Sequence, residues 1–166
     1  MNLKLKLNEL DIISMQEQLD EIVFNHIDTS ANYEQAYKQI APKLDEALQF
    51  LQRYLQANGV ETPPGNTYWI LFAGLISKLA YFKAFTMWKL QHGSAEEMNR
   101  LFITSAYVLP NKETEVNEEI LEDIAAHYTL FQQQAGHEAT IDLHKEALAQ
   151  KFSSTDCLAY IVKQLA

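Results

Sequence analysis

The sequence contains little cysteine, proline or glycine. Its 166 residues include one cysteine, four prolines and five glycines. Because Cys157 has no second cysteine to pair with, an intrachain disulfide and a thiolate metal cluster are both excluded, and nothing indicates an oxidising compartment. Two of the prolines lie in GVETPPGN, residues 59–66, which is the one clear loop. We therefore expect a cytoplasmic protein whose fold depends on its apolar core.

Basic residues are also scarce. The chain has 13 Lys and Arg against 22 Asp and Glu, which gives a formal net charge of −9 at pH 7. Nonspecific nucleic-acid binding depends on neutralising phosphates with Lys and Arg, so this balance argues against DNA, RNA and anionic membrane surfaces as partners. The acid is concentrated at two flanks, with net charges of −4 in residues 1–30 and −6 in residues 111–151.

Sequence signals for export and for catalysis are missing. Acidic Glu9 and Asp11 fall where a signal peptide needs its hydrophobic region. There is no G-x-S-x-G nucleophile elbow and no glycine-rich phosphate loop. None of the five histidines has a glutamate three residues before it, and no H-x-x-x-H occurs, so a histidine-rich metal site is not expected. The sequence thus predicts no catalytic residue and no cofactor.

The stretch YWILFAGLISKLAYFKAFTMW, residues 68–88, has the length of a membrane span. Lys78 and Lys83 interrupt it near the middle, and a lysine there costs roughly 2.5 to 3.5 kcal/mol on insertion scales. Helical spacing places small residues on one side and large ones on the other, as in a helix buried all round. The small set is Ala73, Ser77, Ala80 and Ala84, and the large set is Leu71, Phe72, Leu75, Leu79, Phe82 and Leu90. We predict a central core helix over about 67–92 rather than a membrane span.

Lys83 lies on the bulky side of this helix and has two interpretations. Its methylene groups could cover apolar surface while the ammonium reaches water. Alternatively, it could be a desolvated lysine paired with a carboxylate. The sequence leaves both open.

Apolar periodicity predicts further helices before and after the central one. The first helix covers about 9–28, and its inward positions start at Ile12. Thr29 or Ser30 is expected to cap the second helix. That helix is expected to continue through a kink at Pro42. Serine begins two later helices, Ser94 with Glu97 as a capping box and Ser153 with Asp156. Residues at helical spacing mark a helix over about 114–134 and a sixth helix before Ser153. Those of the first are Val116, Ile120, Ile124, Tyr128 and Phe131, and those of the second are Ile141, His144, Leu148 and Phe152.

These helices predict one all-α domain over 1–166, a bundle of six or seven helices. The first, second and fifth helices are expected to surround the central one. NLKLKLN, residues 2–8, alternates with period two and reads as an extended N-terminal arm or short strand. Asn58 and Gly59 are expected to form the cap that ends the second helix. Whether the helices around Gly136 are continuous stays open.

The predicted fifth helix carries a row of acids that we call the acid ridge, formed by Glu115, Glu118, Glu119, Glu122 and Asp123. Like charges four residues apart repel by a few tenths of a kcal/mol per pair. Such a row is commonly the solvated face of an amphipathic helix, and its N-terminal acids interact favourably with the helix dipole. It is also suited to binding a basic partner, since acidic patches steer encounters with cationic surfaces. Asp123 and His127 are expected to form a surface pair.

Within the ridge, Glu118, Glu119 and Glu122 spell E-E-x-x-E, which resembles half of the motif of all-α nucleotide pyrophosphohydrolases of the MazG type. That resemblance implies Mg²⁺ bound by carboxylates together with substrate phosphates. Such enzymes carry E-x-x-D on a following helix, whereas this chain has Glu138 and Asp142 at a spacing of four residues. The five acids named here are the ligand set of this alternative.

The sequence as a whole therefore favours a non-catalytic interaction protein that neutralises or escorts a basic partner protein, as immunity and antitoxin proteins do. A Mg²⁺-dependent nucleotide hydrolase is the alternative. A carrier that holds an apolar ligand against the central helix is a third possibility, and the chain could also form a homo-oligomer.

Overall fold

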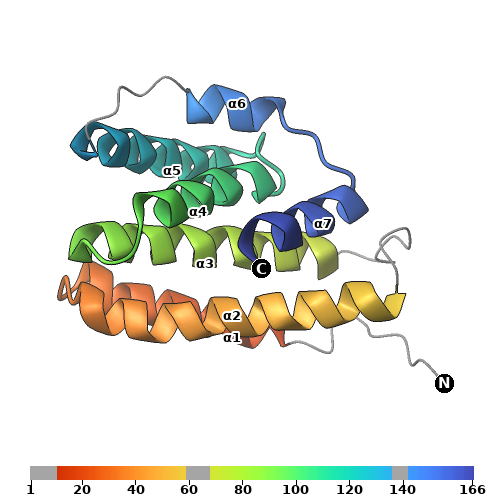
Figure 1. Ribbon diagram of the computed structural model, residues 1–166, viewed down its shortest axis with the longest axis horizontal. Helices are drawn as coiled ribbons and strands as arrows, with labels where there is room; N and C mark the ends of the chain where they lie inside the picture. The colour runs from red at the N-terminus through yellow and green to blue at the C-terminus, as the bar shows by residue number, and fades with distance from the viewer. Residues whose placement is uncertain (1–10, 59–67, 136–141) are drawn as a thin grey trace.

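The computed structural model describes residues 11–58, 68–135 and 142–166, and Figure 1 shows their arrangement. These residues form seven α-helices and one π-helical segment, with no strand among them. The helices are α1 (Ile12–Ile22), η2 (Val23–Asp28), α2 (Tyr33–Asn58), α3 (Tyr68–Leu90), α4 (Ala95–Val108), α5 (Glu115–Gln134), α6 (Leu143–Ala149) and α7 (Ser154–Leu165). The predicted all-α bundle is confirmed. The expected arm over 2–8, the Asn58–Gly59 cap and the question at Gly136 involve residues outside these ranges.

Helix α3 is the central helix, as the sequence predicted. Between Trp69 and Leu90 it is long and apolar enough to cross a membrane, but 61% of its most apolar window is buried inside the molecule. Its small residues are all fully buried, and the Oγ of Ser77 donates a hydrogen bond of 2.7 Å to the carbonyl oxygen of Ser105 on α4. A packed protein core therefore accounts for its composition.

The predicted neighbours of α3 need one correction. Its most extensive contacts are with α4 and α2, and those with α1, α7 and α5 are smaller. Helix α4 takes this place because the small side of α3 permits close approach there. Even the ring of Pro110, just after α4, comes within 3.8 Å of the Cβ position of Gly74.

Four apolar positions that were expected to face the core are exposed, and one of them is Leu90 at the end of α3, with an exposed fraction of 36%. Val116 is 68% exposed, since it stands in the first turn of α5 and the buried side of that helix begins at Leu121. Leu71, near the start of α3, is 43% exposed. In α6 the buried pair is Leu143 and Ala147, which turns Leu148 outward. The predicted register of that helix was wrong because it was extended to Phe152, beyond the helix end.

Two helix ends differ from the prediction. The first helix changes from α to π geometry at Val23, and the hydroxyl groups of Thr29 and Ser30 donate to carbonyl oxygens at its end, those of Phe24 and Asn25. Neither caps α2. Instead, the side chain of Asn32 accepts a hydrogen bond of 3.2 Å from the Gln35 amide.

Other end signals are confirmed. The hydroxyl oxygens of Ser94 and Ser153 each accept an amide hydrogen bond of 3.1 Å, from Glu97 and Asp156. Helix α2 continues through Pro42. Local capping chemistry therefore sets where α4 and α7 begin.

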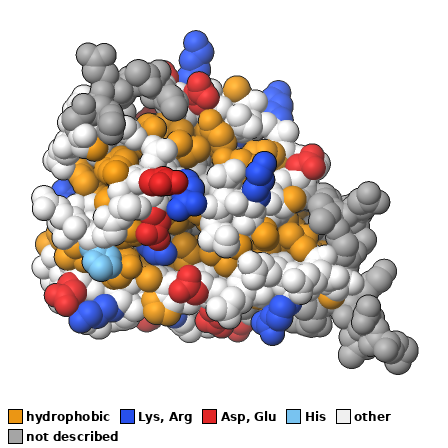
Figure 2. Space-filling view, in the orientation of Figure 1, with side chains coloured by type: hydrophobic (Ala, Val, Ile, Leu, Met, Phe, Trp, Pro, Cys, Tyr) orange, Lys and Arg blue, Asp and Glu red, His pale blue; other side chains and the backbone are white. Residues whose placement is uncertain are grey.

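Helices α1, α3 and α5 run in the same direction, and α2 and α4 run in the opposite one (Figure 1). On the face shown in Figure 2, Lys and Arg side chains are interspersed with Asp and Glu, and hydrophobic side chains show between them. Neither sign of charge dominates this face.

Candidate functional site

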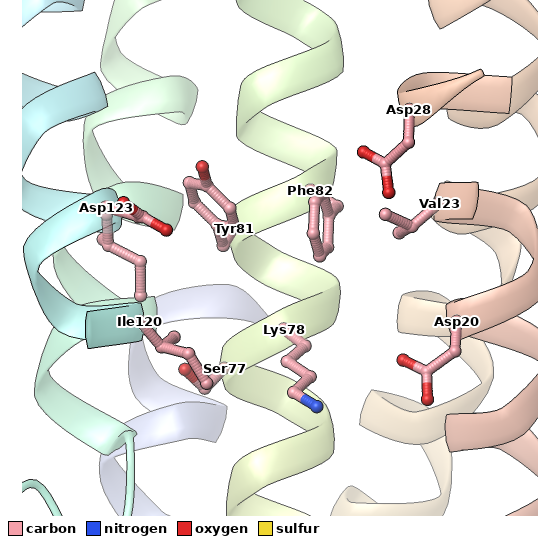
Figure 3. A pocket seen from close by; sticks show the side chains of 10 residues that line it. Asp20, Val23, Asp28, Ser77, Lys78, Tyr81, Phe82, Ile120 and Asp123 are labelled. Atoms are coloured by element: carbon pink, nitrogen blue, oxygen red, sulfur yellow. The ribbon is translucent and has the colours of Figure 1, made fainter. Parts of the chain in front are cut away.

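A cavity of about 310 Å³ opens between α1 with η2, α3, and α5 (Figure 3). Its volume is at the lower end of the range of small-molecule sites and suits one large side chain. Figure 3 shows α3 in the middle, with α1 and η2 on one side and α5 on the other. Apolar side chains from all three sides line it, namely Val23, Phe82, Ile120 and Ile124.

The polar lining is mainly acidic. Asp20 comes from α1, Asp28 from η2, Asp123 from α5 and Lys78 from α3. None of the three carboxylates forms an ion pair with Lys78, and the Oδ1 of Asp20 accepts a hydrogen bond of 3.2 Å from the side-chain Nε2 of Gln16 within α1. The two acidic flanks of the sequence therefore meet at one cavity, across the central helix.

The π-helical segment sets the position of Asp28. Eight residues separate it from Asp20, and in an α-helix this spacing would turn the two side chains about 80° apart. A π-helix has a wider turn, so each residue from Val23 onward advances by a smaller angle and much of that offset is removed. Single π turns inside α-helices occur frequently at functional sites. Here the turn lets both aspartates line the same cavity.

An apolar surface continues the cavity along the helices. Ile13, Leu71 and Val116 each lie seven residues before a polar cavity residue on the same helix, and their exposed fractions are 59%, 43% and 68%. Seven residues are nearly two full turns, so each apolar side chain shares a side with its acid or lysine, about 10 Å away along the axis. Because α1, α3 and α5 run in one direction, the three side chains are displaced to the same end. We call them the apolar flank.

The acid ridge divides between two surroundings. Asp123 lines the cavity. Glu118 and Glu122 turn toward α6 and lie near His144, with ligand atoms of the three side chains within 4.8 Å of one another. Glu115 and Glu119 are exposed and belong to neither group. The ridge is thus not one uniform face.

His127 does not form the expected surface pair with Asp123. It is half-buried, and its Nδ1 lies 2.6 Å from the hydroxyl oxygen of Tyr81 on the cavity wall. Burial lowers the pKa of His127, and burial together with the Asp123 carboxylate raises the pKa of Tyr81. Both groups are therefore neutral near pH 7, and they are joined by a hydrogen bond whose direction depends on the histidine tautomer.

This hydrogen bond fixes the cavity wall within an aromatic cluster. The ring centroid of His127 lies 5.2 Å from that of Phe85 and 6.1 Å from that of Trp88. From the sequence, Tyr81 was expected only to form part of the core helix. Its spacing from His127 along the chain offers no signal that could have linked the two.

Lys83 is paired with a carboxylate. Its Nζ lies 3.2 Å from Oε1 of Glu97, and the exposed fractions of the two side chains are 14% and 40%. Of the two interpretations, the pairing is therefore the one observed. The Glu97 carboxylate, expected to complete a capping box, joins α3 to the first turn of α4 instead.

The predicted magnesium ligands are only partly brought together. Glu118 and Glu122 are close, but Glu119 is outside their group. Asp142 caps α6, since its Oδ1 accepts a hydrogen bond of 3.2 Å from the Lys145 amide. Glu138 is among the residues that the structure does not describe. His144, whose spacing only helped to mark the predicted sixth helix, takes the third place beside the two glutamates.

No protein-family model, curated protein or solved structure matches the chain.

Proposed function

We propose that the protein is a non-catalytic, cytoplasmic binding protein that neutralises or escorts a basic partner protein, in the manner of immunity and antitoxin proteins. The observation that carries this proposal is the cavity at which carboxylates from both acidic flanks meet without an ion-pair partner among the described residues.

The shape and chemistry of the cavity suit a lysine or arginine side chain of the partner. Its aliphatic stem would lie on Val23, Phe82 and Ile120. Its charged end would reach the carboxylates of Asp20 and Asp123, where charge-assisted hydrogen bonds are about twice as strong as neutral ones. The lining also contains the Lys78 ammonium, but its three carboxylates outnumber this one positive charge, so the cavity carries an excess of negative charge.

The apolar flank would contact the neighbouring part of the same partner segment. Ile13, Leu71 and Val116 are exposed in the free protein, and burying apolar surface contributes roughly 25 cal/mol per Å². A segment with a basic residue and an apolar residue about 10 Å apart, as two turns of a helix provide, would contact both parts. The acidic charge would speed association at low salt, and the apolar contacts would slow dissociation.

The test begins with capture of partners from lysate of the native organism, followed by affinity measurements with the purified partner. The cavity variants are Asp20→Asn and Asp123→Asn, and the ridge variant is Glu119→Gln. Glu46→Gln on α2, an exposed residue that does not line the cavity, is the matched control for loss of one negative charge. Circular dichroism verifies that each variant folds.

We expect a basic partner whose affinity falls about tenfold or more with each cavity variant and steeply with added salt. The Glu46→Gln control should bind like the wild type. An equal loss of affinity in all variants, the control included, would show that binding depends only on net charge and would contradict a defined site. If the only captured protein is the chain itself, the surface is a homo-oligomer interface. If nothing is captured, Mg²⁺-dependent nucleotide hydrolysis is the next assay.

A further inference from the structure

Three potential metal ligands meet where α6 packs beside α5 (Figure 1), away from the proposed partner cavity. Glu118 and Glu122 lie one turn apart on α5, and His144 stands in the first turn of α6. One ligand atom from each side chain lies within 4.8 Å of the other two. The cluster therefore joins two helices through oxygen and nitrogen donors.

In this cluster, the His144 side chain has one ring nitrogen without a hydrogen-bond partner among the described residues. Its Nε2 is shielded from solvent and forms no hydrogen bond within the part of the chain that the structure describes. A buried polar group left unpaired destabilises the folded state, and such groups in native proteins call for an explanation. A metal ion joins ligand atoms that are too far apart for a hydrogen bond. Coordination would also remove the repulsion between the two glutamates, which are four residues apart.

We propose that Glu118, Glu122 and His144 bind one divalent transition-metal ion of the zinc type. Imidazole suits zinc, cobalt and iron, whereas magnesium and calcium prefer sites made only of oxygen ligands. Ligand atoms about 2.0–2.1 Å from a tetrahedral ion are about 3.3 Å apart. The two exposed glutamate side chains have the freedom to close that difference by rotation. The bound ion would fasten α6 to α5 and keep its fourth position open to water.

The experiment measures Zn²⁺ binding to the untagged full-length chain by titration calorimetry and records the visible absorption of bound Co²⁺. The variants are Glu122→Gln, which changes an exposed side chain without altering its shape, and His144→Ala. Glu119→Gln is the matched control, because it removes one charge from the same helix outside the cluster. If His144→Ala does not fold, Glu122→Gln alone decides.

The expected result is one Zn²⁺ per chain and a tetrahedral Co²⁺ spectrum, both retained in Glu119→Gln. Altering even the groups around a metal ligand weakens binding about 10- to 100-fold, so loss of a ligand in the other two variants should weaken it at least tenfold. Three results would overturn the proposal: no binding of Zn²⁺ at micromolar concentrations, equal binding by all variants, or a melting temperature raised as much by Mg²⁺ as by Zn²⁺. Because Asp20 and Asp123 are not ligands, this outcome is independent of the partner experiment.

Discussion

Replacing Gly93 by alanine is expected to destabilise the protein by at least about 1–2 kcal/mol. Gly93 follows the end of α3 with φ of +86°, and the left-handed region costs a residue with a Cβ roughly 1–2 kcal/mol. The added methyl group would also collide with the terminal methyl of Met87. Met87 is only 1% exposed, so its side chain has to move within the packed core, which adds to the cost.

The same substitution at Gly74 should have the opposite effect. Gly74 lies inside α3, and the nearest heavy atom to an added Cβ is Cγ of Pro110 at 3.8 Å, an ordinary van der Waals contact. Alanine is more favourable than glycine in a helix interior by about 0.8–1.0 kcal/mol. Gly74→Ala should therefore stabilise the protein by about that amount.

Urea unfolding of the two variants and the wild type measures the difference. The two midpoints should move in opposite directions at an unchanged m-value, which would show that stability has changed and the exposed surface has not. Wild-type stability in Gly93→Ala would refute the left-handed conformation at the end of α3. A loss of stability in Gly74→Ala would show that α3 and the segment after α4 pack more tightly than the distances indicate.

The remaining predictions concern the ion pair and the buried titratable groups. Glu97→Gln should lower the free energy of unfolding by about 1 kcal/mol, because it leaves the Lys83 ammonium partly buried without its partner. Adding Lys83→Met to that variant should restore much of the lost stability, as a double-mutant cycle would measure. Strictly additive effects of the two substitutions would argue against the pair. Burial raises the pKa of the Cys157 thiol to about 11 from its ordinary 9.0, so iodoacetamide should alkylate it far more slowly in the folded protein than in urea at pH 8. The pKa of Tyr81 is also raised, so the unfolded chain releases these protons first and the free energy of unfolding should fall as pH rises above about 9; urea midpoints that stay constant from pH 8 to pH 11 would contradict this.

Periodicity and capping chemistry were enough to predict most of the helices, because both act over a few neighbouring residues. The buried side of α3 follows from its composition, and Ser94 and Ser153 begin their helices through hydrogen bonds to amides three residues ahead. The errors lie at positions whose burial depends on a neighbouring helix and not on the spacing within their own helix. Val116 has the correct spacing for a core position, but no helix among the described residues covers it in the first turn of α5, and it is 68% exposed.

The candidate sites depend on contacts that local patterns do not contain. Asp20 and Asp123 are more than a hundred residues apart in the sequence and meet because α1 and α5 flank α3. The flank charges indicated that both segments are acidic, without indicating that they converge. His144 lies beside the two glutamates because the start of α6 packs against α5. The residues before His144 contain no metal-ligand motif that could have predicted this from the sequence.

The π turn of η2 has a consequence for how the sequence can vary. It holds one residue more than an α turn, so deleting a single residue between Val23 and Asp28 would restore an ordinary helix. The buried positions of α1, which come before the turn, would keep their places, and Asp28 would then stand seven residues after Asp20, nearly two full α turns away and on the same side of the helix. Related chains that lack one residue at this point would therefore share both the bundle and the pair of aspartates at the cavity. A length difference there would carry little information on binding specificity, whereas replacement of Asp20 or Asp28 would change the cavity directly.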